Sequence, residues 1–310
     1  MRKFMILWIL FFMLPVFGQK GLSEKYPDKF NRLSKLVKKS YSEAELKKLL
    51  SSPNVAVMDK QTERNLRFIL TPLSLKKQKS QHEDFVPKLV NEKTVAKGVE
   101  FFKKYKKTFE AVDKKLKVHP ADIIAILNWE SKLGELTGDQ RIIQIFIGQY
   151  FLWKEYLDVF EKEGVFKKKG AMSRPDAEKR AKRLEKNALG NLAALLNQSK
   201  KKNFDPAQAK GSWAGAIGFP QFMPASMTYA MDGNGDGKID LFNMEDAIFS
   251  IANYLVKHKY AKKGSEYSFK RYNPDKVYIR GVKLYSDMAK KAGVKIECDP
   301  KASAVCPIEF

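Results

Sequence analysis

Apolar residues recur at helical spacing along most of this 310-residue chain, and this periodicity restricts its fold more than any other feature. Runs that predict helices cover residues 28–50, 94–116, 120–133, 141–161, 176–198 and 244–258. In the first run, Ser42 and Glu45 have the spacing of a helix capping box. Alternating runs of β-branched residues are scarce. Because 44% of the residues are hydrophobic, the chain can bury a core and is not expected to be disordered. Together with the helical periodicity, this predicts a mostly α-helical protein.

The first eighteen residues have the pattern of an export signal. Arg2 and Lys3 precede an apolar run over residues 4–17, and Gly18 follows as a small residue at a plausible cleavage point. The run is shorter than the about 20 residues that a membrane-spanning helix needs. We therefore interpret residues 1–18 as a signal peptide, with an uncleaved anchor as the alternative. The mature protein is then exported, periplasmic or associated with the cell envelope, and has no stable membrane span.

The chain is strongly basic, with 58 Lys and Arg against 35 Asp and Glu and a net charge of +23. Such a charge favours an anionic partner: nucleic acid, a membrane surface or an acidic polysaccharide. Export argues against nucleic acid. A Lys-rich surface can also be solvated without any partner, so the charge alone does not choose between the remaining candidates.

The only two cysteines, Cys298 and Cys306, lie close together in a C-terminal tail that we place at residues 291–310. Outside the cytoplasm we expect them to form a disulfide that closes a small loop. The three histidines are scattered and do not suggest a zinc cluster. The nucleophile elbow of a serine hydrolase is also missing from the sequence.

One acidic residue, Glu130, falls on the apolar stripe of the helix that Pro120 is expected to start. The same face of this helix carries Ile123, Ile126 and Leu127. Desolvation and the negative end of the helix dipole both raise the pKa of a carboxyl group in this position. A raised pKa suits a general acid that works near neutral pH. The alternative is a glutamate that simply leaves the core and pairs with a lysine.

A nine-residue stretch from Asp232 to Asp240 matches the start of a calcium-binding loop. The expected ligands are side-chain oxygens of Asp232, Asn234 and Asp236 and the carbonyl of Lys238. Asn243 occupies the twelfth position, where a glutamate is usual, but Asp246 at the fifteenth could close a longer loop. We predict a structural Ca²⁺ site, with an Asp- and Gly-rich surface turn as the alternative.

Segment 211–224 is rich in Gly and Pro and predicts a shaped loop. Its aromatic residues and Gln221 suit sugar binding, because rings stack on the apolar faces of sugars and an amide can bond hydroxyl or acetamido groups. A packed structural loop accounts for the same residues equally well.

Taken in this order, these segments resemble the membrane-bound lytic murein transglycosylase B family, glycoside hydrolase family 103. The helix over residues 119–134, the loop over 211–224 and the calcium loop over 232–246 each resemble a family motif. The Ala-Asn-Tyr ending at Tyr254, the Arg-Tyr-Asn around Tyr272, and Tyr278 resemble later ones. The resemblance covers about 25–290.

The resemblance implies a lysozyme-like core over residues 94–290, preceded by a helical region over 19–93. It implies cleavage of the β-1,4 bond between N-acetylmuramic acid and N-acetylglucosamine in peptidoglycan, with a 1,6-anhydromuramic acid end as product. Glu130 would be the single acid and base. Residues in substrate-binding positions would be Ser212, Gln221, Tyr254, Tyr272 and Tyr278.

The sequence departs from the family pattern at several places. Asn128 and Leu133 replace a glycine and an aromatic residue around Glu130, and the stretch between Tyr254 and Tyr272 is shorter than usual. Segment 162–205 is longer and more basic. Two alternatives therefore stay open: a muramidase that lets water attack, and a non-catalytic scaffold that binds peptidoglycan.

Overall fold

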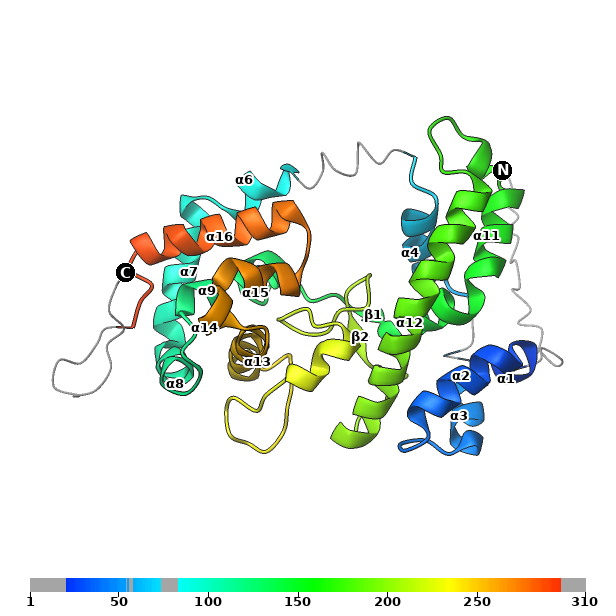
Figure 1. Ribbon diagram of the computed structural model, residues 1–310, viewed down its shortest axis with the longest axis horizontal. Helices are drawn as coiled ribbons and strands as arrows, with labels where there is room; N and C mark the ends of the chain where they lie inside the picture. The colour runs from blue at the N-terminus through cyan, green and yellow to red at the C-terminus, as the bar shows by residue number, and fades with distance from the viewer. Residues whose placement is uncertain (1–20, 54, 56–57, 74–82, 297–310) are drawn as a thin grey trace, which may run out of the picture.

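Helices make up most of the protein, and two hydrophobic cores divide them into two lobes (Figure 1). The computed structural model describes residues 21–53, 55, 58–73 and 83–296. The predicted mostly α-helical fold is confirmed. The predicted signal peptide and the cysteine pair lie outside the described residues. Within the described part of the chain, no helix combines the length and apolarity needed to cross a membrane.

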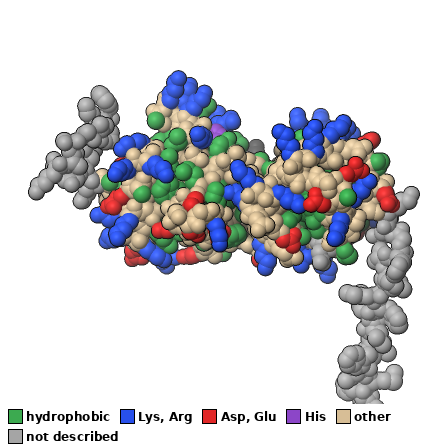
Figure 2. All heavy atoms as spheres, turned by 90° about the horizontal axis from the view of Figure 1, so that it is seen from below, with side chains coloured by type: hydrophobic (Ala, Val, Ile, Leu, Met, Phe, Trp, Pro, Cys, Tyr) green, Lys and Arg blue, Asp and Glu red, His purple; other side chains and the backbone are tan. Residues whose placement is uncertain are grey.

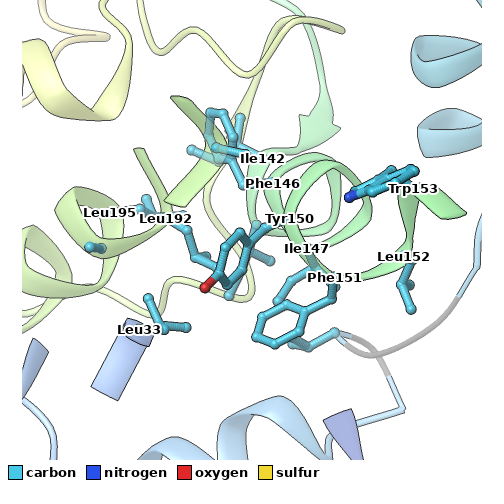
Figure 3. Close-up of a cluster of buried hydrophobic side chains, with 14 of the residues drawn as sticks. Leu33, Ile142, Phe146, Ile147, Tyr150, Phe151, Leu152, Trp153, Leu192 and Leu195 are labelled. Atoms are coloured by element: carbon cyan, nitrogen blue, oxygen red, sulfur yellow. The ribbon is translucent and has the colours of Figure 1, made fainter. Parts of the chain in front are cut away.

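The first lobe brings the N-terminal helices against the middle of the chain. Its elements are α1 (Leu22–Lys25), α2 (Pro27–Val37), α3 (Glu43–Leu50), α4 (Lys60–Leu70), α10 (Ile142–Ile147), a π-helical segment η1 (Gly148–Leu152), α11 (Trp153–Lys162), two 3₁₀ segments, η2 (Val165–Lys167) and η3 (Pro224–Tyr229), and the long α12 (Arg174–Lys202). Figure 3 shows how Leu33 from α2 and Leu192 from α12 lie around Phe146 and Tyr150 in its core.

The second lobe combines two separate stretches of chain. Its helices are α6 (Phe85–Leu89), α7 (Glu92–Lys104), α8 (Lys106–Leu116), α9 (Pro120–Ser131), α13 (Met244–Lys257), α14 (Tyr260–Lys263), α15 (Ser265–Tyr272) and α16 (Lys276–Lys291). Helix α9 lies in its centre, with its residues from Pro120 to Asn128 all buried. Each core thus contains segments from distant parts of the chain. The proposed boundary at residue 93 stays a prediction.

Several predicted helix ends are confirmed. Ser42 and Glu45 form the reciprocal hydrogen bonds of a capping box at the start of α3. Pro120 stands in the first turn of α9. Backbone N–H groups in this turn have no partner within the helix, so the N–H that proline lacks is not needed there. These signals are local, so the sequence alone carries them.

The helix predicted over 94–116 is wrong in one respect, because the chain forms two helices that meet at Tyr105. The backbone of Tyr105 leaves the helical region at φ −106° and ψ 25°. The bend lets aromatic rings from both helices share one core: the ring centroids of Phe101 and Phe102 lie 6.2 and 5.7 Å from that of Phe109. Packing in the core therefore overrides the continuous amphipathic pattern.

The helix predicted over 141–161 contains the π-helical segment η1 in its middle. Such an insertion often marks a functional place in a helix. At Gly148, an added Cβ would lie 2.0 Å from Cγ2 of Thr62, so the missing side chain lets α4 approach closely. The next residue, Gln149, donates to Oδ1 of Asn65 on α4 at 2.9 Å. The segment thus holds α4 in register with α10.

A buried carboxylate anchors the start of α9 to the end of the chain. Asp122 is 1% exposed and accepts hydrogen bonds from the hydroxyls of Tyr260 and Ser286, and from Nζ of Lys290 at 3.0 Å. His119 caps the helix by accepting from the Ala121 amide at 3.1 Å through Nδ1. Burial lowers the pKa of His119, which favours the neutral ring that this cap requires.

We predict that Asp122→Ala lowers the free energy of unfolding by about 3 kcal/mol, because it leaves buried hydroxyl donors without their acceptor. Urea denaturation followed by circular dichroism measures this. The matched control is Asp287→Ala on α16, which removes an exposed ion pair with Lys283. It should change stability by less than about 0.5 kcal/mol. Equal effects of the two substitutions would contradict the anchoring role.

Candidate active site

Glu130 lies half-buried in the last turn of α9. The helix ends in a tight turn in which Lys132, Leu133 and Gly134 have φ values of 49°, 60° and 98°. An added Cβ at Gly134 would lie 2.8 Å from Cε of Met244, so glycine lets this turn pack against the start of α13. The turn therefore places Glu130 next to the loop and helix that carry the other candidate residues.

Burial raises the pKa of Glu130 from its usual 4.5 to about 8, and the hydroxyl of Tyr278 lowers it. No charge of another carboxylate from the described residues contributes to this shift. The predicted direction of the shift and its main cause, desolvation, agree with the structure. At neutral pH the carboxyl group is therefore mostly protonated and can donate a proton.

Three predicted tyrosines come together beside Glu130. The negative charge of Glu130 helps to raise the pKa values of Tyr272 and Tyr278 well above 10, after burial as the largest cause. The ring of Tyr272 lies 6.4 Å from that of Tyr278, in parallel, and 4.7 Å from that of Tyr254, edge to face. Both Tyr272 and Tyr278 thus remain neutral hydrogen-bond donors at any physiological pH.

The hydroxyls of these tyrosines differ in their partners. The Tyr254 hydroxyl donates to the carbonyl of Arg271 at 2.6 Å, and that of Tyr272 donates to the carbonyl of Pro220 at 2.5 Å. The Tyr278 hydroxyl is buried and forms no hydrogen bond of standard geometry within the described residues. Unlike the hydroxyls of Tyr254 and Tyr272, it is therefore free to donate to Glu130 or to a ligand.

The loop over 211–224 has the shaped backbone that the sequence predicts. Strand β1 (Gln140–Arg141) pairs antiparallel with β2 (Lys210–Gly211), and a further bridge joins Ile217 to Phe222. An added Cβ at Gly138 would lie 2.4 Å from the carbonyl oxygen of Gly211, so this crossing of two backbones requires glycine.

Gln221 and Ser212 occupy opposite ends of this loop. Gln221 has a positive φ of 50°, and its Nε2 donates to the carbonyls of Gly218 at 2.7 Å and Thr137 at 3.3 Å. Oγ of Ser212 accepts from the Ala216 amide at 3.1 Å. The structure therefore brings Gln221 to the chain that follows Glu130, whereas Ser212 stabilises the far turn of the loop.

The predicted calcium loop is folded by its own carboxylates. Asp232 accepts from the amides of Gly235 and Gly237 at 2.7 and 2.8 Å. Asp246 is buried, and its two oxygens accept from the amides of Gly233 and Asp240, each at 2.7 Å. Asp246 therefore ties the two ends of the loop together.

The donor set of this loop consists of the hard oxygen ligands that Ca²⁺ prefers. Asn234 and Asp236 lie on its exposed side, where Oδ1 of Asp236 accepts from the Lys238 amide at 2.8 Å. Among the described residues, no three His, Cys, Asp or Glu side chains converge as a metal site. The chemistry of the residues thus fits calcium, and the site itself stays a prediction.

The loop over 232–246 also supports the loop over 211–224. The amide of Phe219 donates to the carbonyl of Leu241 at 2.9 Å, and an added Cβ at Gly218 would lie 2.4 Å from the same oxygen. The rings of Phe219 and Phe242 meet edge to face at 6.2 Å. A change in the calcium loop can therefore reach the backbone around Gln221.

Trp129, the neighbour of Glu130, is not among the site residues that the sequence predicts. Its ring meets that of Tyr278 edge to face at 5.6 Å, and an added Cβ at Gly281 would lie 2.0 Å from its Cζ3. Asn128, noted only as a departure from the family pattern, is buried and donates to the carbonyl of Leu89 at 2.8 Å. An aromatic residue directly beside the candidate acid was the available signal.

Comparison with known proteins identifies the family of this chain. The model of the transglycosylase SLT domain family matches residues 28–296. The membrane-bound lytic murein transglycosylase B of Escherichia coli strain K12 is 29% identical over 176 residues, which make up 56% of this chain and 41% of that protein. The match thus spans less than half of that relative's length.

Solved structures of similar fold cover most of the chain. The Escherichia coli lytic transglycosylase SLT35, in complex with calcium, has a TM-score of 0.66 at 21% identity over 89% of this chain and 97% of that one. SltB3 of Pseudomonas aeruginosa, in complex with NAG-anhNAM-pentapeptide, has a TM-score of 0.59 at 18% identity over 91% and 83%. The predicted lysozyme-like fold is confirmed. This chain therefore belongs to the transglycosylase SLT domain family, and its resemblance to lytic murein transglycosylase B is borne out.

Proposed function

We propose that the protein is a lytic transglycosylase of peptidoglycan that uses Glu130 as its single acid and base. It cleaves the β-1,4 bond between N-acetylmuramic acid and N-acetylglucosamine and leaves a 1,6-anhydromuramic acid end. The observation that carries this proposal is the half-buried carboxyl group of Glu130, with a pKa of about 8, in a family of transglycosylases.

The reaction needs two proton transfers through one carboxyl group. Protonated Glu130 donates its proton to the glycosidic oxygen as the bond from that oxygen to the muramic C1 breaks. The resulting carboxylate takes the proton of the muramic O6 hydroxyl, and O6 forms the new bond to C1. The sugar's own N-acetyl group stabilises the positive charge that develops at C1 between these steps.

A single carboxylate distinguishes this mechanism from that of most glycosidases. Those enzymes use a pair of carboxyl groups, which lie about 5–9.5 Å apart. A second ionised carboxylate at such a distance would raise the pKa of Glu130, but only burial and Tyr278 shift it among the described residues. The pKa of Glu130 is therefore consistent with a mechanism that uses one carboxyl group.

The tyrosines beside Glu130 are suited to hold the substrate and the acid in place. Tyr278 can donate to the carboxylate that Glu130 becomes after the first proton transfer, and this would stabilise it until O6 is deprotonated. Tyr254 and Tyr272 present aromatic faces that can pack against a sugar ring. Gln221 and Ser212 offer polar groups from the neighbouring loop.

The basic surface gives the enzyme a second way to associate with the cell wall. Figure 2 shows Lys and Arg side chains over both lobes on the visible face. Removing the signal peptide takes away Arg2 and Lys3 and leaves 56 basic against 35 acidic residues, a charge of +21. Peptidoglycan carries carboxylates on its stem peptides, so we propose that this charge favours association in the cell envelope rather than chemistry.

We predict that Glu130→Gln lowers product release from purified sacculi by at least about 10³-fold, because the amide can neither donate nor accept the proton. Mass spectrometry of the soluble products should show anhydromuramic ends for the wild type. Its kcat/KM should fall as the pH rises through about 8, where the acid form is lost. The control is Glu135→Gln, an exposed glutamate that pairs with Lys97.

Two outcomes would contradict the proposal and identify an alternative. Reducing ends in place of anhydro ends would indicate a muramidase. Binding to sacculi without soluble product, equal for the wild type and Glu130→Gln, would indicate a non-catalytic scaffold.

The pKa of Glu130 also predicts how stability depends on pH. The folded state binds the Glu130 proton more tightly than the unfolded chain does. The stability that this proton contributes is therefore fully present below pH 4.5 and is lost as the pH rises to about 8. Glu130→Gln removes that loss. Its melting temperature relative to wild type should therefore increase between pH 5 and pH 8 and then level off. A difference that stays constant over this range, as expected for Glu135→Gln, would contradict the raised pKa.

We propose that the loop over 232–246 binds a structural Ca²⁺ through Asp232, Asn234, Asp236, the Lys238 carbonyl and Asp246. The oxygen donor set supports this, as does the calcium complex of SLT35. A bound ion would hold the loop that braces Phe219 and, through it, the backbone near Gln221. Its part would be support of the site rather than chemistry.

We predict that a chelator lowers the melting temperature of the wild type, because a ligand that binds only the folded state stabilises it by about 2.7 kcal/mol at 100 times its Kd. Asp232→Ala should melt at the same temperature with CaCl₂ and with chelator. The control Asp139→Ala, on the turn before β1, should keep the calcium response. A wild type that melts identically in both conditions excludes the site.

A further inference from the structure

A hollow of about 370 Å³ lies between α4 and the start of the loop over 211–224. It is lined by Gln61, Arg64, Asn65, Phe68, Gln140 and Trp213. Neither the proposed mechanism nor the predicted substrate-binding residues include any of these side chains. The hollow combines aromatic and hydrogen-bonding groups in the manner of a ligand site.

The floor of the hollow is an exposed aromatic pair. Phe68 and Trp213 are both 51% exposed, and their ring centroids lie 5.2 Å apart at an interplanar angle of 83°. Large aromatic side chains are usually buried to a high degree, so two neighbouring exposed rings need a reason. Crossed rings offer one flat face and one edge to a ligand that has its own flat apolar face.

The backbone of Trp213 is held in place from below. Nδ2 of Asn65 donates to the Trp213 carbonyl at 2.8 Å, and Oδ1 of Asn65 accepts from Gln149 at 2.9 Å. Asn65 and Gln149 are both buried. A platform that is already rigid loses little conformational entropy when a ligand binds, which is how preorganised sites gain affinity.

The rim of the hollow carries hydrogen-bonding groups that the fold does not need. On the same helix, Arg67 pairs with Glu63 at 2.6 Å and with Glu163 at 2.7 Å. Arg64 is exposed and has no ion pair within the described ranges. Its planar guanidinium group and the amides of Gln61 and Gln140 can therefore bond hydroxyl and acetamido oxygens of a ligand.

The small sheet of β1 and β2 connects the hollow with the segment that follows Glu130. Gln140 pairs with Gly211 in the small sheet, directly before Ser212 and Trp213. Three residues before Gln140, the carbonyl of Thr137 accepts from Gln221. The chain before β1 thus leads back to the turn that follows Glu130, and the chain after β2 leads to Trp213 of the exposed pair.

We propose that this hollow is a distal saccharide subsite, which seats an N-acetylated sugar ring of the same glycan strand several units from the bond that is cleaved. This proposal rests on the proposed function. A pyranose ring has an apolar C–H face that covers Trp213, while its hydroxyl and acetamido groups meet Arg64, Gln61 and Gln140. The hollow has two aromatic rings and two neutral amide side chains but only one cation. This composition favours a sugar over the acidic stem peptide as the occupant.

The test compares long and short substrates. Trp213→Ala and Phe68→Ala should lower kcat/KM about tenfold on long glycan strands, because truncation of a central aromatic contact costs most in a binding site. Neither should change it on a tetrasaccharide, which does not reach the hollow. Trp213→Tyr should restore most of the loss. The control is Tyr267→Ala, an exposed aromatic residue on α15 that contacts Lys263.

A binding measurement separates this proposal from the proposed function. Full-length Glu130→Gln is titrated calorimetrically with N-acetylglucosamine oligomers of two and six units. We expect Trp213→Ala to raise the Kd of the hexamer about tenfold and to leave that of the dimer unchanged. Equal changes for both lengths, or none, would overturn the subsite.

Two further results are informative. If Trp213→Ala and Phe68→Ala lower kcat/KM only on strands that still carry stem peptides, and not on peptide-free strands, the hollow is a peptide site and not a saccharide subsite. If no variant or wild type releases product from sacculi, the proposed function fails, whereas the oligomer titration still decides on the subsite by itself.

Discussion

The position of Glu130 depends on how helix α9 is held at its two ends. At its start, the buried carboxylate of Asp122 accepts from α14 and α16. At its end, Trp129 packs closely against α16 at Gly281, and the turn after Ser131 packs on α13. A buried polar anchor fixes the height of the helix along its axis, and close packing at glycine fixes its rotation. Both are needed because a catalytic group displaced by about 1 Å loses much of its effect.

The other groups of the site follow from this frame. The loop over 211–224 joins the two lobes, since Tyr272 of the second lobe donates to its backbone and Asn65 of the first lobe holds Trp213. The loop in turn rests on the chain over 232–246. The site therefore lies where both lobes contribute, and its polar groups are aimed by backbone contacts rather than by flexible side chains.

Local signals made much of this predictable. The capping box of α3, the proline at the start of α9 and the glycine-rich loop depend on neighbours in sequence, and the raised pKa of Glu130 was predictable from its place on the apolar face of α9. The bend at Tyr105 and the π-helical segment were not predictable, because they arise from rings and helices that meet in the core. The nearness of Tyr278 to Glu130 came only from the family resemblance, since no spacing rule relates residues on α9 and α16.

The alternation of the chain between the two lobes has a consequence for how the protein acquires its structure. Tyr41 shares a buried hydrogen bond with Ser199, 158 residues away, and Lys29 pairs with Glu185 across 156 residues. The N-terminal helices therefore gain their full set of partners only when α12 has been made, and closing such large loops is slow. The packing of the first lobe is therefore complete only once most of the chain has been made.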